Sequence, residues 1–230
     1  MGSSDNIYVI IVAAGVGSRF GAKMPKQYCL LDGIPVLMHT INQFRSALPN
    51  SDIRLVISRE MDSFWKELCE KYNFQSPEIV YGGQSRIESV RNALLSLTDK
   101  GSKVLIHDGV RPLIDCLTIK NVLKEVKSGI GVAPALNVTD SLRKVLESGQ
   151  SVTVNRSEYK SIQTPQGFIL SEIRSAYNTP SPEATDDLSV WENYGGETQL
   201  VQGSTDNIKI TNPKDILIAS ILRGNSSVHQ

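Results

Sequence analysis

The sequence predicts an α/β fold in which a mostly parallel sheet carries helices on both faces and a β-arm projects from it. An apolar run at residues 7–12 ends in a glycine-rich loop, which is typical of a strand buried on both faces. Patterns typical of strands and helices then alternate as far as residue 135, as in βαβ units. A polar stretch with β-branched residues, 137–163, interrupts this alternation.

The individual elements follow from hydrophobic periodicity and from the positions of glycine and proline. After the first strand we expect strands at residues 53–57, 78–81, 103–107, 130–135, 197–201 and 208–210. Helices are expected at residues 35–48, 61–72, 85–97, 117–126, 170–177, 186–194 and 213–222, followed by a disordered tail at 224–230. Because such sheets bind ligands at the carboxyl ends of their strands, the loops that follow the strands are the candidate site.

The interrupting stretch is interpreted as an arm within a single domain that spans residues 1–230. Residues 138–145 and 151–155 have the composition of two strands of a hairpin, joined by the turn Glu147-Ser148-Gly149-Gln150. This pattern does not fit a βαβ unit. The alternative is an edge hairpin that lies on the sheet.

Composition excludes several classes of function. The chain has 24 basic and 24 acidic residues, so its net charge of zero argues against nucleic-acid binding through a general basic field. Apolar runs fall short of the roughly 18 residues of a membrane span. The polar first residues do not resemble a secretory signal. Three widely spaced cysteines suit a reducing cytoplasm and lack metal-ligand spacing, so we expect a cytoplasmic protein.

The loop after the first strand is predicted to bind phosphate. Its small residues let backbone N–H groups approach an anion. Glycines at 15, 17 and 21 match neither the nucleoside-triphosphatase loop nor the dinucleotide loop. The basic residues Arg19, Lys23 and Lys26 favour a highly charged ligand, such as a triphosphate.

A second motif follows the predicted strand at 78–81. Gly82 and Gly83 lead into a helix for which Ser85 is the expected N-cap, with Glu88 at the capping-box spacing. Backbone groups beside these glycines can receive a base or a sugar. Ser89, one turn into the helix, is placed to face the same ligand, although capping alone would explain Ser85 and Glu88.

Asp108 ends the apolar strand at 103–107 and is the candidate metal ligand. Mg²⁺ often takes one or two protein carboxylates and completes its shell with substrate phosphates. The alternative is an aspartate that only caps the following turn.

Four further segments are weak evidence for a function when each is taken alone. Arg156 leaves the predicted arm and would have to reach a site elsewhere, such as one in a second subunit. Thr164 precedes a proline, and Asp186 is a plausible helix cap. Lys209 lies near the end of the sheet, where a cation could reach a phosphate.

Taken together, seven motifs in order resemble the 2-C-methyl-D-erythritol 4-phosphate cytidylyltransferases of the non-mevalonate isoprenoid pathway, nearly end to end. The motifs are Ala13-Ala14-Gly15-x-Gly17-x-Arg19, Pro25-Lys26-Gln27-Tyr28, Gly82-Gly83-x-x-Arg86-x-x-Ser89-Val90, His107-Asp108-x-x-Arg111-Pro112, Gln163-Thr164-Pro165-Gln166-x-Phe168, Thr185-Asp186-Asp187 and Asn207-Ile208-Lys209.

This resemblance implies a Rossmann-like nucleotidyltransferase fold and a homodimer with an exchanged arm, residues 137–163. It implies a CTP site lined by Ala13, Ala14, Gly15, Gly17, Gly83 and Ser89. Arg19 and Lys26 would be catalytic, and Asp108 would hold Mg²⁺ or another divalent cation. The residues implied to position the second substrate are Arg156, Lys209, Ser141 and Thr164.

The sequence departs from the family pattern at two places. Ser141 stands where the family often has threonine, a change that keeps the hydroxyl. The residues after Arg156 lack a Leu-Trp pair that is common in the family, which affects the local packing of the arm but not the arginine itself.

The expected activity is transfer of CMP from CTP to a polyol phosphate, with no nucleic-acid or membrane partner. Transfer to methylerythritol phosphate is favoured, and transfer to ribitol 5-phosphate is the nearest alternative. Thr185-Asp186-Asp187 with Glu192 leans modestly toward methylerythritol phosphate. The alternative from another class is a non-catalytic regulatory module that binds CTP.

Overall fold

The computed structural model describes residues 6–15, 24–98, 102–179 and 184–226. Its strands are β1 (Ile7–Val12), β2 (Leu30–Leu31), β3 (Ile34–Pro35), β4 (Asp52–Ile57), β5 (Glu78–Tyr81), β6 (Lys103–Asp108), β7 (Ile130–Asn137), β8 (Arg143–Val145), β9 (Ser151–Thr153), β10 (Lys160–Ile162), β11 (Gln166–Ile169) and β12 (Glu197–Gln202). Its α-helices are α1 (Val36–Ala47), α2 (Asp62–Lys71), α3 (Arg86–Ser96), α4 (Cys116–Glu125), α5 (Leu170–Tyr177), α6 (Asp187–Asn193) and α7 (Pro213–Ser226). Short 3₁₀ helices are η1 (Lys26–Tyr28), η2 (Arg59–Met61) and η3 (Arg156–Glu158).

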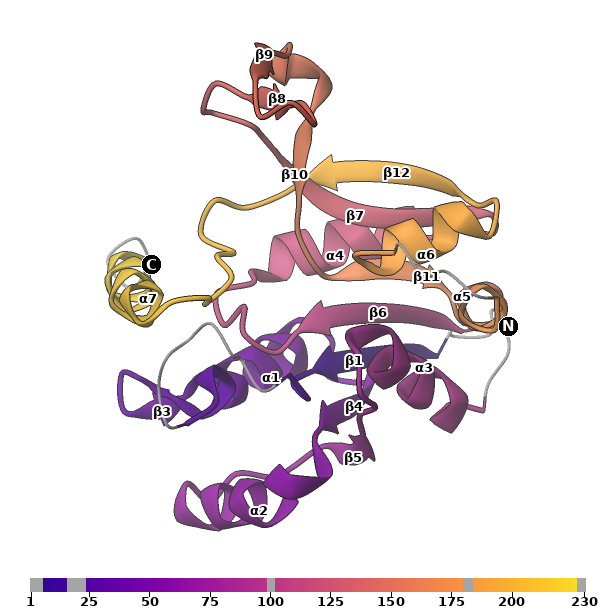
Figure 1. Ribbon diagram of the computed structural model, residues 1–230. Helices are drawn as coiled ribbons and strands as arrows, with labels where there is room; N and C mark the ends of the chain where they lie inside the picture. Colours follow the sequence, from indigo (N-terminus) through magenta and orange to yellow (C-terminus); the bar gives the residue numbers. More distant parts are fainter. Residues whose placement is uncertain (1–5, 16–23, 99–101, 180–183, 227–230) are drawn as a thin grey trace.

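An eight-stranded sheet forms the centre of the molecule (Figure 1). β1 pairs in parallel with β4 and β6, β4 with β5, and β12 with β7. β10 and β11 run antiparallel to successive stretches of β7, and β11 also pairs with β6. The α/β class with a mostly parallel sheet is confirmed, and the carboxyl ends of β1, β4, β5 and β6 meet at one edge.

Side-chain alternation along β1 divides the core into two layers. Val9 and Ile11 pack with α1, α2 and α4 on one face, whereas Tyr8 and Ile10 pack with α3, α5 and α6 on the other. Successive side chains of a strand point to opposite faces, so a continuous apolar run is what a doubly covered strand requires. None of the described helices is long and apolar enough to cross a bilayer.

The arm stands apart from this sheet. β8 and β9 pair only with each other, as a separate two-stranded sheet that Figure 1 shows projecting beyond β7 and β12. Both strands are shorter than the expected segments 138–145 and 151–155. Their side chains are mostly exposed, including Val145 at 71% and Val152 at 43%. The chain returns to the main sheet through β10.

β10 and β11 were not predicted from the sequence. The segment is polar, contains Pro165, and places Gly167 inside β11, all features that weaken a strand signal. Packing explains the glycine, because a Cβ there would lie 2.6 Å from a Val126 methyl group and 2.9 Å from a Leu105 methyl group. Gly167 therefore weakens the sequence signal for β11, although the packing of the sheet requires a glycine at this position.

Two other predictions were wrong. Residues 208–210 are not a strand; Ile210 donates its N–H to the Val110 carbonyl at 2.9 Å, but the segment is otherwise irregular. The expected disordered tail was also wrong at its start, because α7 extends through Ser226. The remaining tail residues, 227–230, lie outside the described part of the chain.

Candidate active site

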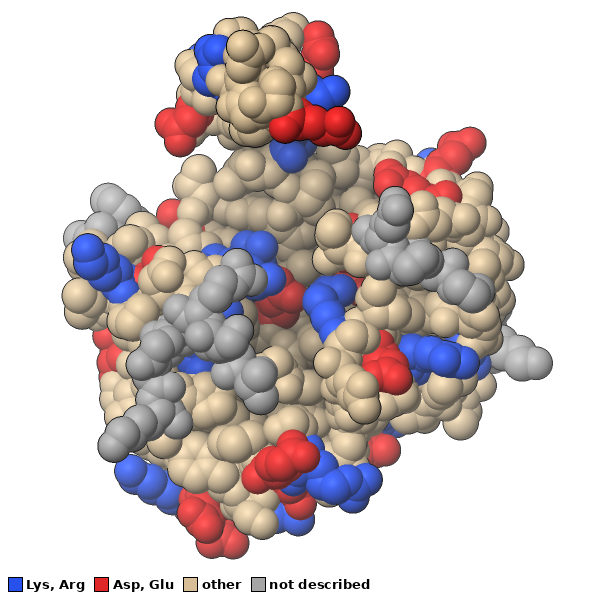
Figure 2. Space-filling model, viewed as in Figure 1, with Lys and Arg blue, Asp and Glu red and all other residues tan. Residues whose placement is uncertain are grey.

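A cleft of ≈ 760 Å³ opens at the edge where the parallel strands end. Its wall includes residues that follow β1, β4 and β5, together with the last residue of β6. This is where an open α/β sheet binds its ligands. Figure 2 shows basic side chains on both sides of an acidic one in the hollow below the arm.

Most of the predicted site residues meet in this cleft. Its lining includes Ala13, Ala14, Gly15, Lys26, Gly83, Ser89, Asp108 and Lys209. Gly17 and Arg19, predicted for nucleotide binding and catalysis, lie outside the described residues. Ser141 and Arg156 lie in the arm, and the Arg156 guanidinium donates to the Thr139 carbonyl. The roles of all these residues stay predictions.

Asp108 is the acidic centre of the cleft. It is 7% exposed, and its carboxylate lies 2.9 Å from Lys209 Nζ, 3.5 Å from Arg111 Nε and 3.6 Å from Arg86 Nε. Burial alone would raise the pKa of Asp108, but Arg86, Lys209 and Arg111 outweigh it and hold that pKa well below its usual range. The carboxylate is therefore ionised, and the cations around it exceed its charge, which suits polyanionic ligands.

The hydrogen bonds around His107 fix its tautomer. Nε2 lies 3.3 Å from the Arg111 carbonyl oxygen, which can only accept, so Nε2 carries the proton. Nδ1 must then accept from the Thr164 hydroxyl, 3.0 Å away. Burial lowers the pKa of His107 to about 3, so the ring stays neutral.

With this tautomer, the Thr164 hydroxyl uses both its proton and its oxygen in hydrogen bonds within the protein. Its proton goes to His107, and its oxygen accepts the Asp108 N–H at 3.2 Å. Thr164 therefore fixes the backbone of Asp108. Its predicted contact with substrate stays a prediction.

A buried amide holds the irregular segment that carries Lys209. Asn207 is fully buried, and its side-chain amide donates to the Thr164 carbonyl at 2.9 Å. Its backbone carbonyl accepts from Arg111 Nη1 at 2.8 Å. Side chains thus satisfy the backbone here in place of a strand ladder, and they keep Lys209 within reach of Asp108.

Gln27 anchors the side of the cleft that is formed by the loop after β1. Its side-chain Nε2 donates to the Ala13 carbonyl at 2.7 Å and to the Gly15 carbonyl at 3.0 Å. Gln27 is 2% exposed and directly follows Lys26 in η1. These two hydrogen bonds tie η1 directly to the loop that follows β1.

The second glycine motif is held by Ser89. Its hydroxyl accepts from the Gly83 N–H at 3.1 Å and donates to the Ser85 carbonyl at 2.8 Å. A Cβ on Gly82 would lie 2.5 Å from the Ala14 Cβ, so the absence of a side chain lets the two loops touch. Ser85 caps α3 as expected, accepting from the Glu88 N–H at 3.1 Å.

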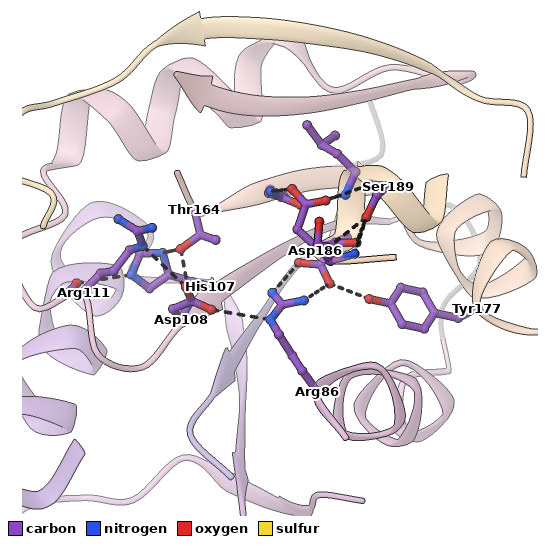
Figure 3. A network of polar contacts seen from close by, with 12 residues as sticks. Arg86, His107, Asp108, Arg111, Thr164, Tyr177, Asp186 and Ser189 are labelled. Carbon is purple, nitrogen blue, oxygen red and sulfur yellow. Dashed lines mark hydrogen bonds and ion pairs between the residues drawn. The ribbon is translucent and has the colours of Figure 1, made fainter. Parts of the chain in front are cut away.

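Arg86 was not recognised as a site residue from the sequence. It is the first residue of α3, where the helix dipole disfavours a cation. That unfavourable position was the available signal that Arg86 has a compensating partner. The partner is Asp187, which accepts from both terminal nitrogens of the guanidinium at 2.8 and 2.7 Å; Figure 3 draws these contacts as dashed lines from Arg86.

Asp186 acts as a helix cap, as the sequence allowed. Its carboxylate accepts from the Ser189 N–H at 2.9 Å and from the Gln166 amide at 2.7 Å. The other end of that amide accepts from the Leu188 N–H at 2.8 Å. Both acidic residues of the Thr185-Asp186-Asp187 motif therefore form hydrogen bonds with other parts of the protein.

A mostly parallel sheet whose strands end at a cationic cleft around one carboxylate is typical of a Rossmann-like α/β protein that binds an anionic ligand. The family model for 2-C-methyl-D-erythritol 4-phosphate cytidylyltransferase matches residues 7–224. The chain belongs to this family.

Relatives and solved structures agree with this assignment. The 2-C-methyl-D-erythritol 4-phosphate cytidylyltransferase of Porphyromonas gingivalis is 44% identical over 94% of this chain and 96% of its own. The Bacteroides thetaiotaomicron enzyme of the same name is 42% identical, over 93% and 98%. The crystal structure of 4-diphosphocytidyl-2C-methyl-D-erythritol synthase from Anaerococcus prevotii superposes with a TM-score of 0.79 at 29% identity, covering 96% of this chain and 100% of that one.

Proposed function

We propose that the protein transfers CMP from CTP to 2-C-methyl-D-erythritol 4-phosphate, giving 4-diphosphocytidyl-2-C-methyl-D-erythritol and pyrophosphate. One observation carries the proposal: in a chain of this family, a buried, ionised Asp108 lies in a cleft that also presents Lys26, Arg86 and Lys209. Such a cleft can hold two polyanions side by side. The product would enter isoprenoid biosynthesis.

The reaction needs charge stabilisation more than acid–base catalysis. An oxygen of the substrate phosphate forms a bond to the α-phosphorus of CTP, and the bond from that phosphorus to the bridging oxygen of pyrophosphate breaks. A phosphate monoester has a second pKa of about 6, so the attacking group needs no general base at neutral pH. The enzyme's task is to position the two substrates and stabilise the added charge.

Lys26 and Lys209, which both line the cleft, are proposed to do this work. Lys26 is anchored next to the loop by Gln27, so it can stabilise negative charge on the α-phosphate as the new bond forms. Lys209 Nζ can exchange its contact with Asp108 for the phosphate of the second substrate. Arg19, outside the described residues, is proposed to assist Lys26.

Asp108 fits the role of ligand for Mg²⁺ or another divalent cation. Groups of three or more His, Cys, Asp or Glu ligands are lacking within the described residues, and Mg²⁺ commonly needs only one or two carboxylates besides phosphates. A cation bound there would neutralise phosphate charge as a Lewis acid. Asp108, held through its N–H by Thr164, would keep that cation at the floor of the cleft.

The arm is proposed to complete the site of a second subunit in a homodimer. Arg156 and Ser141, expected to position the second substrate, lie in the arm, and the cleft of their own chain is lined without them. Exposed apolar side chains on the arm, Val145 and Tyr159, and on α7, Leu217 and Ile221, would be covered by the partner. Sedimentation should show a dimer that Val145→Glu weakens, and a wild-type monomer would refute the exchange.

The identity of the second substrate is inferred from the family to which the chain belongs. Asp186 bonds to Gln166, Asp187 bonds to Arg86, and Glu192 accepts from the Thr198 hydroxyl at 3.2 Å, so the choice between the polyol phosphates is argued from the relatives. The relatives at 42–44% identity favour methylerythritol phosphate over ribitol phosphate. Pyrophosphate release from CTP and Mg²⁺ with each polyol phosphate tests the proposal.

The three free cysteines support a cytoplasmic location.

A further inference from the structure

Asp187 connects the interior of the molecule to the wall of the cleft. The side chain is fully buried at the first residue of α6. Besides its two bonds from Arg86, it accepts one from the Tyr177 hydroxyl (Figure 3). Arg86 lines the cleft, so the cluster of Arg86, Asp187 and Tyr177 runs from the core to the ligand-binding surface.

The two helix starts explain why this cluster is stable. The first turn of a helix favours an anion and disfavours a cation. Asp187 is therefore well placed at the start of α6, and it compensates Arg86, which is poorly placed at the start of α3. Burial and the Asp187 charge both raise the pKa of Tyr177, so the phenol keeps the proton that it donates.

The geometry also orients the guanidinium. Bidentate binding to Asp187 fixes the plane of the group, and Nε then lies 3.6 Å from the Asp108 carboxylate. Each terminal nitrogen has a second N–H, which can serve a ligand oxygen. If Asp187 lost its charge, Arg86 would keep Asp108 as its anionic partner and would turn toward it.

We propose that Asp187, assisted by Tyr177, is a positioning residue that holds Arg86 in the orientation needed to bind the nucleotide. This inference rests on the proposed function, because it takes CTP as the ligand of the cleft. It concerns the binding step, so it can be tested without the second substrate.

The test is calorimetric titration of the full-length protein with CTP, with and without Mg²⁺. Loss of one charge-assisted interaction predicts CTP binding that is about tenfold weaker in Asp187→Asn and about threefold weaker in Tyr177→Phe. Asp32→Asn is the matched control: Asp32 also pairs with an arginine, at 2.7 Å from Arg223, and asparagine tolerates its φ of 49°. This control should bind CTP as the wild type does.

A double-mutant cycle separates positioning from general structural support. Because the two residues act as one unit, Arg86→Lys combined with Asp187→Asn should bind CTP no more weakly than the weaker single variant. A purely structural role would lower the melting temperature but leave the CTP affinity of the folded protein unchanged, and that result would overturn the proposal.

Two further outcomes are also decisive. If Asp187→Asn does not fold, Tyr177→Phe, which keeps both charges, decides the question, and wild-type affinity in that variant overturns the inference. If the wild type itself does not bind CTP, the proposed function fails, and this inference fails with it. The two failures are therefore distinguishable.

Discussion

The cleft and the arm differ in the kind of side chain that each buries and the kind that each exposes. The polar residues that support the cleft from behind its lining are buried and hydrogen-bonded: His107, Asp187 and Asn207 are each 0% exposed. The arm places apolar groups in solvent, with Val145 at 71% and Tyr159 at 46% exposure. One region buries polar atoms that need partners, and the other exposes apolar atoms that need cover.

This difference indicates which parts of the site a single chain can complete. Buried polar groups are costly unless they are satisfied, so the network around Asp108 holds its geometry without help from another molecule. In the arm, the Arg156 guanidinium bonds to the Thr139 carbonyl, and Arg156 does not line the cleft of its own chain. We therefore expect substitutions in the cleft to act within one subunit, and those in the arm to act on a neighbour.

The largest effect is expected from Lys26→Ala. Loss of a preorganised donor to the reacting phosphate commonly costs on the order of 10²–10³ in rate. The fold should survive, because the two hydrogen bonds by which Gln27 ties η1 to the loop stay in place. Turnover by the purified variant, with circular dichroism as the control for folding, measures this. Near-normal turnover would contradict the catalytic assignment.

Arg156→Ala should lower turnover by about 10- to 100-fold, through the loss of one or two charge-assisted hydrogen bonds to phosphate. The comparison between the two regions is sharpened by mixing this variant with Lys26→Ala. If the arm serves the neighbour, half of the randomly formed dimers have one intact site of two, giving about a quarter of the wild-type rate. No recovery in verified mixed dimers would place both residues in the same subunit's site.

Acidification should destabilise the protein through His107. The folded pKa of about 3 lies below the ordinary value of 6.5, so below pH 6.5 the unfolded chain binds a proton that the folded chain does not. Between pH 6.5 and 5 this costs about 2 kcal/mol of the free energy of unfolding. Urea unfolding in chelator, with His107→Asn for comparison, measures it; equal losses in the two proteins would show that other groups cause the effect.

The smallest predicted effects compare two serines. Ser85→Ala removes the cap of α3 and should lower the free energy of unfolding by about 1 kcal/mol. Ser148→Ala, in the exposed turn of the arm, should change it by less than about 0.5 kcal/mol. Chemical unfolding of both variants checks the difference. A larger loss for Ser148→Ala would mean that the arm is more tightly packed than its exposure indicates.

The sequence was informative where local chemistry matched the final structure. The run at residues 7–12 predicted β1, and the glycines after it predicted the cleft, because period and turn chemistry are local properties. β11 and the segment around Lys209 were missed or misassigned, since long-range packing and the buried Asn207 determine them. Arg86 was missed because its partner, Asp187, lies 101 residues further along the chain.

Pyrophosphate release from CTP and Mg²⁺, measured with methylerythritol phosphate and ribitol phosphate in parallel, tests the central claim most directly. The account predicts rapid release with methylerythritol phosphate, slow release with ribitol phosphate, and loss of the reaction in Lys26→Ala. Binding of CTP without release of pyrophosphate in the presence of either polyol phosphate would contradict it, and would point instead to a regulatory module that binds the nucleotide.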